Sequence, residues 1–309
     1  MKRMPQPIPY QGSKRNIAAQ ILSVIPDGTH NLIEPFAGSA AISIRAAYVG
    51  KAQHFHLNDL NRPLINLLDR IIHTPGEIAS DYERLWNSQL GRERAYYDEV
   101  RAEFNRTDRP DLFLYLLARC VKASVRYNTN GEFNQGPDNR RKGRHPESMR
   151  AEIFAVSELL KGRTTLTCDD FRNTIHNLNR TTDLIYLDPP YQGTSGGRDS
   201  RYCSGISLSS LIGFLADLNA KKVMYILSYD GRKGSTIYGK KLPDTLGLVH
   251  MEIDAGRSTQ STLLGKTDVT YESLYLSSEL YKRLGSNPRE LGNLASWQSS
   301  HSQLELALV

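Results

Sequence analysis

The sequence predicts an α/β protein in which an open, mostly parallel sheet carries an inserted, mainly helical lobe. Three observations support this prediction. Short apolar runs that end in acidic or proline residues alternate with helical patterns up to about residue 74 and again after residue 160. Between about Pro75 and Met149 the alternation stops and helical periodicity takes its place. Near the end, Val269–Leu276 alternates in the manner of a strand in an antiparallel hairpin.

The composition is that of an ordinary globular chain. It has 309 residues, 39% hydrophobic and 23% charged, enough for a full-sized core and a smaller second lobe. No apolar run approaches the roughly 18 residues that a membrane span needs, and Met1–Pro5 lacks the apolar stretch of a signal peptide, so we expect a cytoplasmic protein. Cys120, Cys168 and Cys203 are odd in number and show no CxxC spacing, which favours packing roles over a disulfide framework or a zinc site.

The positive charge of the chain is concentrated in two stretches. The formal net charge is +6, and residues 1–16 and 119–150 carry net charges of +4 and +5. The remainder of the chain is therefore close to neutral. Basic stretches of this kind favour a polyanionic partner.

The apolar run Leu184–Leu187 predicts a buried strand that ends at the carboxyl edge of the sheet, where open α/β sheets hold ligands. Asp188, Pro189, Pro190 and Tyr191 follow it directly. Two prolines remove two backbone donors and fix the chain, which leaves the Pro189 carbonyl available as an acceptor. A carboxylate, a carbonyl and an aromatic face together suit a planar heterocycle with an exocyclic amino group.

The first predicted βα unit consists of a strand at Asn31–Ile33, a tight turn, and a helix from Ala40 to Tyr48. The turn contains Glu34, Pro35, Phe36, Ala37, Gly38 and Ser39. It has neither a GxGxxG nor a GxxxxGKS pattern, and the acidic Glu34 disfavours a pyrophosphate. A cationic or neutral nucleoside is the better candidate ligand.

Upstream of this unit, Pro9–Lys14 forms a turn that runs into helical periodicity over residues 17–25. We expect Ser13 to cap that helix. Lys14 would then lie in the first turn, against the helix dipole. This placement predicts a negative group nearby, such as a ligand carboxylate.

Two further strand ends carry acids. Ala52–Leu57 is followed by Asn58 and Asp59, and Asp59 lies at a spacing from Glu34 close to that of the acid that holds a ribose hydroxyl in dinucleotide-binding folds. The strand at residues 164–167 leads to Asp170, which could accept from a purine amino group, and to Phe171, which could lie against its ring.

The inserted lobe ends in a segment suited to nucleic acid. After a helical run over residues 112–125, Arg126–Gly136 contains the Asn-Gly pair of a hairpin turn among basic, amide and aromatic residues. Asn, Arg and Gln read base edges, and Tyr can wedge between bases or stack on them. The candidate DNA-binding residues are Arg126, Tyr127, Asn128, Asn130, Asn134, Arg140, Arg141 and Lys142.

The remaining segments complete the predicted sheet. Gln192–Gly205 is rich in Gly and Ser and suits a mobile loop over the site. Ser207 is expected to cap a helix, and Val223–Leu227 to form another buried strand. Residues after Ser277 receive no role.

These motifs, in this order, resemble the Dam-type S-adenosylmethionine-dependent DNA adenine methyltransferases of the alpha group. The resemblance covers nearly everything from Pro7 to about Ser278. The Asp-Pro-Pro-Tyr motif by itself is moderately specific, whereas the combination is highly specific. The segments that carry it are Tyr10–Lys14, Glu34–Ser39, Asn58–Asp59, Arg126–Asn128, Gly131–Asn134 and Asp188–Tyr191.

The resemblance implies a Rossmann-like methyltransferase sheet built from residues 1–60 and 150–278, a DNA target-recognition domain at 61–149, and a C-terminal extension at 279–309 of unassigned role. It also implies S-adenosylmethionine as cofactor and no metal. The turn 34–39 would hold the methionine part, Asp59 the ribose hydroxyls, and Asp170 with Phe171 the adenine. The full set of implied cofactor contacts is Tyr10, Lys14, Glu34, Pro35, Phe36, Ala37, Gly38, Ser39, Asp59, Asp170, Phe171 and Asp188.

The implied reaction is methylation of the adenine N6 amino group in duplex DNA, with the base flipped out of the helix. Asp188 and the Pro189 carbonyl would accept hydrogen bonds from that amino group, and Tyr191 would stack on the base, with Pro190 completing the motif. Two acceptors draw the nitrogen towards tetrahedral geometry and stabilise the positive charge that grows on it. Double-stranded DNA is the implied partner and a restriction endonuclease encoded nearby a candidate one. Neither a membrane nor an obligate protein partner is inferred, and the protein would associate with the nucleoid through DNA.

Alternatives remain open on the sequence alone. Related enzymes that read GATC commonly have a basic residue where this chain has Asn130, so the recognition sequence is undetermined. Methylation of the cytosine N4 amino group uses similar chemistry, whereas methylation at ring carbon needs a Pro-Cys nucleophile that this chain lacks. Glutamine-modifying and some RNA-directed relatives carry Asn in place of Asp188, which disfavours these two classes. A catalytically silent DNA-binding relative is disfavoured by Lys14, Asp59 and Asp188.

Overall fold

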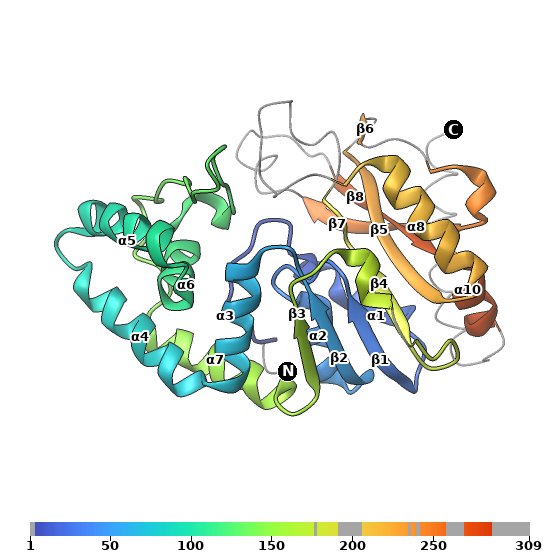
Figure 1. Cartoon of the computed structure of the whole chain (residues 1–309), viewed down its shortest axis with the longest axis horizontal. Coiled ribbons are helices and arrows are strands. Elements are labelled where there is room, and N and C mark those ends of the chain that lie inside the picture. The colour runs from blue at the N-terminus through green and yellow to red at the C-terminus, as the bar shows by residue number, and fades with distance from the viewer. Residues whose placement is uncertain are drawn as a thin grey trace.

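The computed structural model describes residues 4–175, 178–190, 206–233, 236–238, 242–257 and 269–285. Figure 1 shows a lobe built on a twisted sheet and, beside it, a lobe made of helices. Several sequence-based expectations lie outside the described residues, namely those for Tyr191, the Gly- and Ser-rich loop up to Gly205, Cys203, and the chain after Gly285.

The sheet has the order β3-β2-β1-β4-β5-β8-β7, and β6 pairs with β5 off this path. Strands β3, β2, β1, β4 and β5 are parallel, and β8 runs antiparallel between β5 and β7. The predicted mostly parallel sheet with an antiparallel hairpin at the end is thus confirmed. The strands are β1 (Thr29–Glu34), β2 (Ala52–Asn58), β3 (Thr164–Thr167), β4 (Leu184–Leu187), β5 (Met224–Lys233), β6 (Thr236–Tyr238), β7 (Val249–Arg257) and β8 (Val269–Leu276).

The strand order reverses between β1 and β4, which lie side by side with Leu32 opposite Leu184. At such a switch point the connections leave in opposite directions, so the carboxyl ends of the two strands are left open. Glu34 ends β1 and Asp188 follows β4. The fold therefore brings the first predicted turn and the Asp-Pro-Pro segment to one place.

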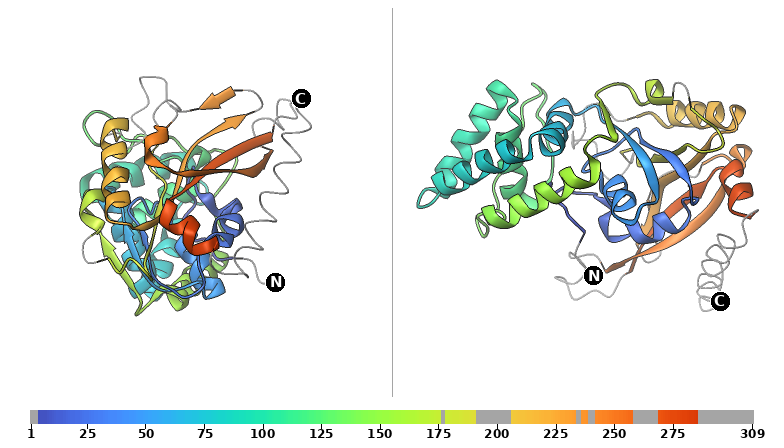
Figure 2. Two further views of the ribbon diagram at one scale, coloured as in Figure 1. Left: turned by 90° about the vertical axis from the view of Figure 1, so that its right-hand side faces the viewer. Right: turned by 90° about the horizontal axis from the view of Figure 1, so that it is seen from below.

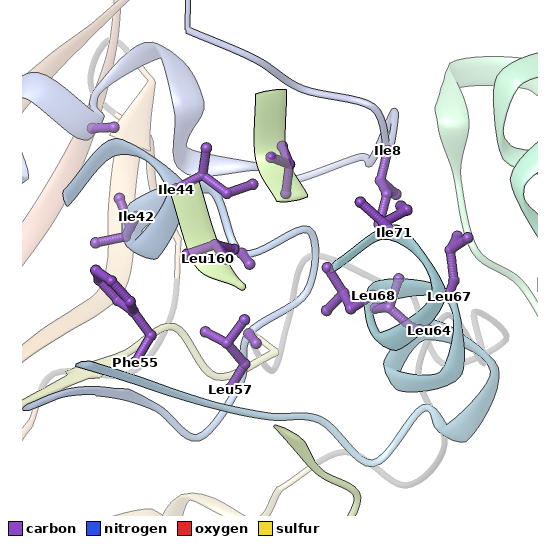
Figure 3. Close-up of a cluster of buried hydrophobic side chains, with 14 of the residues drawn as sticks. Ile8, Ile42, Ile44, Phe55, Leu57, Leu64, Leu67, Leu68, Ile71 and Leu160 are labelled. Atoms are coloured by element: carbon purple, nitrogen blue, oxygen red, sulfur yellow. The ribbon is translucent and has the colours of Figure 1, made fainter. Parts of the chain in front are cut away.

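Both faces of the central strands are covered, and successive residues point into different clusters. Leu32, Tyr186 and Ile226 belong to the larger cluster, and Ile33, Ile185, Leu187 and Leu227 to the smaller. This alternation explains why the parallel strands read as continuous apolar runs. The helices that contribute to the larger cluster include α1 (Ala18–Ser23), α2 (Ala41–Val49), α3 (Arg62–His73) and α7 (Pro146–Leu160), and α8 (Leu208–Ala220) contributes to the smaller. Figure 3 shows part of the larger cluster.

The helical lobe follows α3 and consists of α4 (Pro75–Ser88), α5 (Glu93–Thr107) and α6 (Pro110–Arg119) before the chain returns through α7. Proline stands in the first turn of α3, α4, α6 and α7, where its missing N–H costs no hydrogen bond. Phe104 stacks on Phe113 at 5.0 Å, and Phe133 of the hairpin packs edge-on against both. The buried Phe133 thus anchors the hairpin to the helices.

The helix expected over residues 112–125 ends earlier, at Arg119. Lys122 and Ala123 have φ angles of 59° and 50°, which a helix does not allow. The backbone bonds instead to other segments: Val121 N donates to Gly136 O, and Gln11 N donates to Ala123 O. Tertiary hydrogen bonds therefore override the helical periodicity here.

A helix that the sequence patterns did not predict, α10 (Ser278–Gly285), follows β8 directly. Its Leu280 and Leu284 are buried one turn apart, and the helix contacts β5. Figure 2 shows it at the edge of the sheet lobe. Residues up to Gly285 therefore pack with the sheet, although 279–309 was expected to be an extension.

Candidate active site

A cavity of about 260 Å³ opens at the carboxyl ends of β1, β2 and β4. Its wall brings together nearly all the residues expected at the cofactor site and the catalytic site. They are Tyr10, Lys14, Glu34, Pro35, Phe36, Ala37, Gly38, Ser39, Asp59, Phe171, Asp188, Pro189 and Pro190. The strand order brings together the segments that follow β1, β2 and β4, because these three strands end at one edge of the sheet.

Glu34 is 2% exposed and takes part in the start of α2. Its Oε1 accepts a hydrogen bond of 2.8 Å from the Ser43 backbone N–H. A carboxylate near a helix N-terminus is favourable, but burial opposes its charge. Burial raises the pKa of Glu34 to about 7, lowered in part by Ser43 and raised further by the nearby Asp188.

The turn after Glu34 depends on Gly38, whose φ is 50°. A Cβ at this position would lie 3.2 Å from the ring of Tyr10. Glycine therefore allows the aromatic ring of Tyr10 to pack directly against the turn. The same ring lines the cavity.

Asp59 ties the end of β2 to this turn. The Gly38 N–H donates to its Oδ2 at 3.0 Å, and the Asn61 N–H donates to its Oδ1 at 2.9 Å. Burial raises the pKa of Asp59, and these two hydrogen bonds lower it in part. The carboxylate is thus held in one orientation at the cavity wall.

Lys14 lies between two carboxylates. Its Nζ is 3.3 Å from Asp188 Oδ1 and 3.1 Å from Glu272 Oε2. The expected negative group is therefore present, supplied by the protein itself. The expected cap by Ser13 is wrong: its hydroxyl makes no capping bond to the 3-10 turn Lys14–Asn16 and accepts from the Ser39 hydroxyl at 3.1 Å instead.

Asp188 remains open to the cavity despite its ion pair with Lys14. Its side chain is 21% exposed, and it lines the wall together with Pro189 and Pro190. The two prolines follow the buried strand β4, so no backbone N–H competes for acceptors there. Asp188 and the neighbouring Pro189 therefore both belong to the wall of this cavity.

Asp170 and Phe171 have different surroundings in the structure, and only Phe171 lines the cavity. Phe171 lines the cavity and packs against Phe36 with ring centroids 5.2 Å apart. The Asp170 carboxylate is held by Arg172 through bonds of 2.7 and 2.8 Å and does not line the cavity. Arg172 also lowers the pKa of Asp170.

The hairpin residues expected to bind DNA differ in their surroundings. Tyr127 lines the cavity, and its hydroxyl donates to Asn61 Oδ1 at 3.1 Å. The Asn128 amide closes the turn, because its oxygen accepts from the N–H groups of Asn130 and Glu132 at 2.9 Å each. Asn130 and Asn134 are exposed, whereas Arg126 is half-buried.

The basic residues after the hairpin are exposed but paired. Arg140 and Arg141 each approach the buried Asp138 at 2.9 Å, and Lys142 lies 2.9 Å from Glu93. Arg140 holds the pKa of Asp138 well below its usual range. These acids neutralise part of the basic stretch and hold its side chains in place.

Some residues of the cavity wall belong to no predicted motif. They are Ala41, Ile42, Leu60, Asn61, Ser124, Val125, Tyr186 and Ile206. Most adjoin a motif by one or two positions, which is the signal that could have found them. Ser124 and Val125, just before Arg126, bring the helical lobe to the same cavity.

The charge of the cavity wall is negative. Among the described residues that line it, Glu34, Asp59 and Asp188 are acidic and Lys14 alone is basic. Throughout the part of the chain that the structure describes, there is no group of three or more His, Cys, Asp or Glu side chains that could hold a metal ion. In that same part of the chain, no helix is long and apolar enough to cross a membrane. The excess of acidic side chains on the wall favours a ligand with positive charge.

Comparison with known proteins identifies the family of the chain. Residues 10–257 match the family model of the D12 class N6 adenine-specific DNA methyltransferases. The chain is 34% identical over 194 residues to the Retron Ec67 DNA adenine methylase of Escherichia coli, covering 61% of this chain and 64% of that one. It is 28% identical to Modification methylase StsI of Streptococcus sanguinis, covering 74% and 35%, and 22% identical to the Type II methyltransferase M.FokI of Planomicrobium okeanokoites, covering 84% and 41%.

The chain thus spans between about a third and two thirds of the length of these curated relatives. Among solved structures, the rRNA methyltransferase aviRa of Streptomyces viridochromogenes covers 89% of both chains at 12% identity and a TM-score of 0.38, a likeness too distant to bear on substrate. The family model, in contrast, matches most of the chain, and the matched range includes every position from Tyr10 to Asp188. The chain belongs to the family of D12 class N6 adenine-specific DNA methyltransferases.

Proposed function

We propose that this protein transfers a methyl group from S-adenosylmethionine to the N6 amino group of adenine in duplex DNA. The observation that carries the proposal is the meeting of Asp188 and Pro189 with the acidic, aromatic-lined turn in one cavity. The membership of the chain in an adenine-specific family supports the same substrate.

The charge and the aromatic lining of the cavity support S-adenosylmethionine as the cofactor. S-adenosylmethionine carries a positively charged sulfonium and an amino group. The wall of the cavity has three acidic residues and one lysine, an excess of acids that favours such a ligand. Tyr10, Phe36 and Phe171 offer aromatic faces to its adenosine. When bound, this cofactor supplies an electrophilic methyl group. Asp59, already oriented by Gly38 and Asn61, stands where it could accept from ribose hydroxyls.

The catalytic role falls to Asp188 and Pro189. The Asp188 carboxylate and the Pro189 carbonyl would accept the two hydrogens of the adenine amino group, which frees its lone pair from the ring. Held in this way by Asp188 and Pro189, the lone pair would attack the methyl carbon that the bound cofactor supplies, with a neutral thioether as the leaving group. The nitrogen then gives one proton to Asp188 or to water. A preformed carboxylate stabilises the positive charge on the nitrogen throughout.

The base must leave the duplex to reach this position, so we include base flipping in the proposal. Tyr191 would stack on the flipped ring. Residues 61–149 would recognise the target, with the exposed Asn130 and Asn134 facing base edges and Arg140 the backbone. Residues 1–60 and 150–278, to which α10 adds, would form the catalytic domain. A cognate restriction endonuclease and a cytoplasmic location remain part of the proposal.

The proposal is tested with the purified chain, radiolabelled S-adenosylmethionine and plasmid DNA. Label should enter DNA as N6-methyladenine at one sequence context, identified by sequencing for modified bases. Label on the N4 group of cytosine would contradict the adenine assignment. Absence of label from DNA of all sequences, with the cofactor bound, would contradict catalysis altogether.

A further inference from the structure

Glu272 is an acidic residue that touches the proposed catalytic machinery without lining the cavity. Its Oε2 lies 3.1 Å from Lys14 Nζ, which in turn lies 3.3 Å from Asp188 Oδ1. The Lys14 side chain is 8% exposed, and the two carboxylate side chains are 21% and 23% exposed. The nearly buried ammonium of Lys14 is therefore shared between Asp188, the proposed catalytic carboxylate, and a second carboxylate from a strand distant in sequence.

The sheet is shaped to place Glu272 there. Glu272 stands on β8, opposite Gly231 of β5 and Ile253 of β7. The pairing of β5 with β8 is interrupted by a bulge just before Gly231. A Cβ at Gly231 would lie 2.7 Å from the Tyr271 carbonyl oxygen, so the close approach of β8 depends on this glycine. Bulges beside active sites commonly re-aim a side chain.

The charge balance shows what Glu272 contributes. If Lys14 paired with Asp188 alone, its positive charge would offset the negative charge of that carboxylate. An ion pair with no net charge stabilises little positive charge on a reacting amino group. A second carboxylate within ion-pair distance of the same ammonium leaves the three groups with one net negative charge. It also draws Lys14 towards β8, because the two carboxylates compete for the same cation.

We propose that Glu272 is a positioning residue for methyl transfer: it holds Lys14 between two acids and so preserves the negative charge of Asp188 for the target amino group. This inference rests on the proposed function. Glu272 would act through Lys14 and would not touch cofactor or DNA. Its loss should therefore slow the chemical step more than it weakens binding.

The test compares Glu272→Gln, Glu272→Asp and the matched control Glu252→Gln, a carboxylate on the neighbouring strand β7. We expect Glu272→Gln to lower kcat about tenfold while the dissociation constants for S-adenosylmethionine and DNA change by less than about twofold. Glu272→Asp, which keeps the charge, should recover part of the loss, and Glu252→Gln should match the wild type. An unchanged kcat in Glu272→Gln, or equal losses in kcat and binding without recovery in Glu272→Asp, would overturn the inference.

A double-mutant cycle separates this inference from the proposed function. In a Lys14→Gln background, Glu272→Gln should cause no further loss of kcat, because the cation it positions is gone. Additive losses would overturn the inference. If the wild type transfers no methyl group, the proposed function fails, and the same cycle is then read in unfolding free energies. Favourable coupling between Lys14 and Glu272 there would support the positioning of Lys14, and zero coupling would overturn it.

Discussion

The hydroxyl of Tyr127 donates a hydrogen bond to Asn61 Oδ1 across 3.1 Å, and this bond joins the hairpin of the helical lobe to the start of α3. The Asn61 backbone N–H is at the same time bonded to Asp59. Two hydrogen bonds, from Tyr127 to Asn61 and from Asn61 to Asp59, would therefore connect a ligand bound at Asp59 with a duplex bound at the hairpin.

Tyr127→Phe should weaken the coupling between cofactor and DNA binding. A hydrogen bond of this kind contributes about 1 kcal/mol, which corresponds to roughly a fivefold change in an equilibrium constant. The measurement is the ratio of the cofactor dissociation constants with and without duplex DNA, by calorimetry. Tyr281→Phe, on the exposed face of α10, is the control. A ratio equal to that of the wild type would show that the bond carries no coupling.

Asp188→Ala should reduce methyl transfer severely and leave cofactor binding measurable. Removing one preorganised group at a developing charge costs on the order of 100- to 1,000-fold in kcat. The checks are a label-transfer assay with plasmid DNA and titration of cofactor into the variant. Asp217→Ala, on the exposed side of α8, serves as the control. Full activity in Asp188→Ala would defeat the proposed mechanism.

The buried Glu34 predicts a pH-dependent stability. Burial raises the pKa of this carboxyl from its ordinary value of 4.5 to about 7, so the folded chain holds a proton that the unfolded chain releases in this interval. The stabilisation is complete below pH 4.5 and is lost as the pH rises through about 7, by an amount on the order of 3 kcal/mol.

Urea unfolding of the wild type and of Glu34→Gln between pH 4.5 and 8 measures this contribution. The variant cannot titrate at this site, so the fall in stability with rising pH should be smaller by the same amount. Glu158→Gln, exposed on α7, should behave as the wild type. Parallel curves for the wild type and Glu34→Gln would exclude the raised pKa.

Gly38→Ala should damage the cofactor site beyond its backbone strain. Gly38 and Gly28 both have positive φ angles, so alanine at either position costs on the order of 1 kcal/mol of stability. Only at Gly38 would the added Cβ press on the Tyr10 ring, since nothing lies within 4 Å at Gly28. Cofactor affinity should therefore fall in Gly38→Ala and persist in Gly28→Ala. Equal affinities in the two variants would rule out the role of this contact.

The sequence predicted the parts of the site that strand ends determine. Glu34, Asp59 and Asp188 each end or follow an apolar run, and the order of a parallel sheet then brings them together without further information. The hairpin at Asn130 was likewise readable, because its Asn-Gly turn is local.

Partnerships between side chains could not be predicted in this way. Lys14 and Glu272 are 258 positions apart, and no spacing rule connects them. The Asp170 carboxylate accepts from Arg172 and does not line the cavity, because nearby donors compete for it. Hydrophobic periodicity does not predict which donor a carboxylate binds. The early end of α6 at Arg119 arises from backbone bonds to residues 11 and 136, both distant in sequence.

The helical lobe leaves the sheet after β2 and returns just before β3, and these two strands are neighbours paired from Phe55 opposite Thr164 to Asn58 opposite Thr167. The pairing of β2 with β3 thus holds the two ends of the insertion next to each other. An excursion closed at its base in this manner can lengthen, shorten or be exchanged by grafting with little disturbance to the strands beneath. Chimeras joined at this base would be a practical route to new sequence specificities on an unchanged catalytic frame.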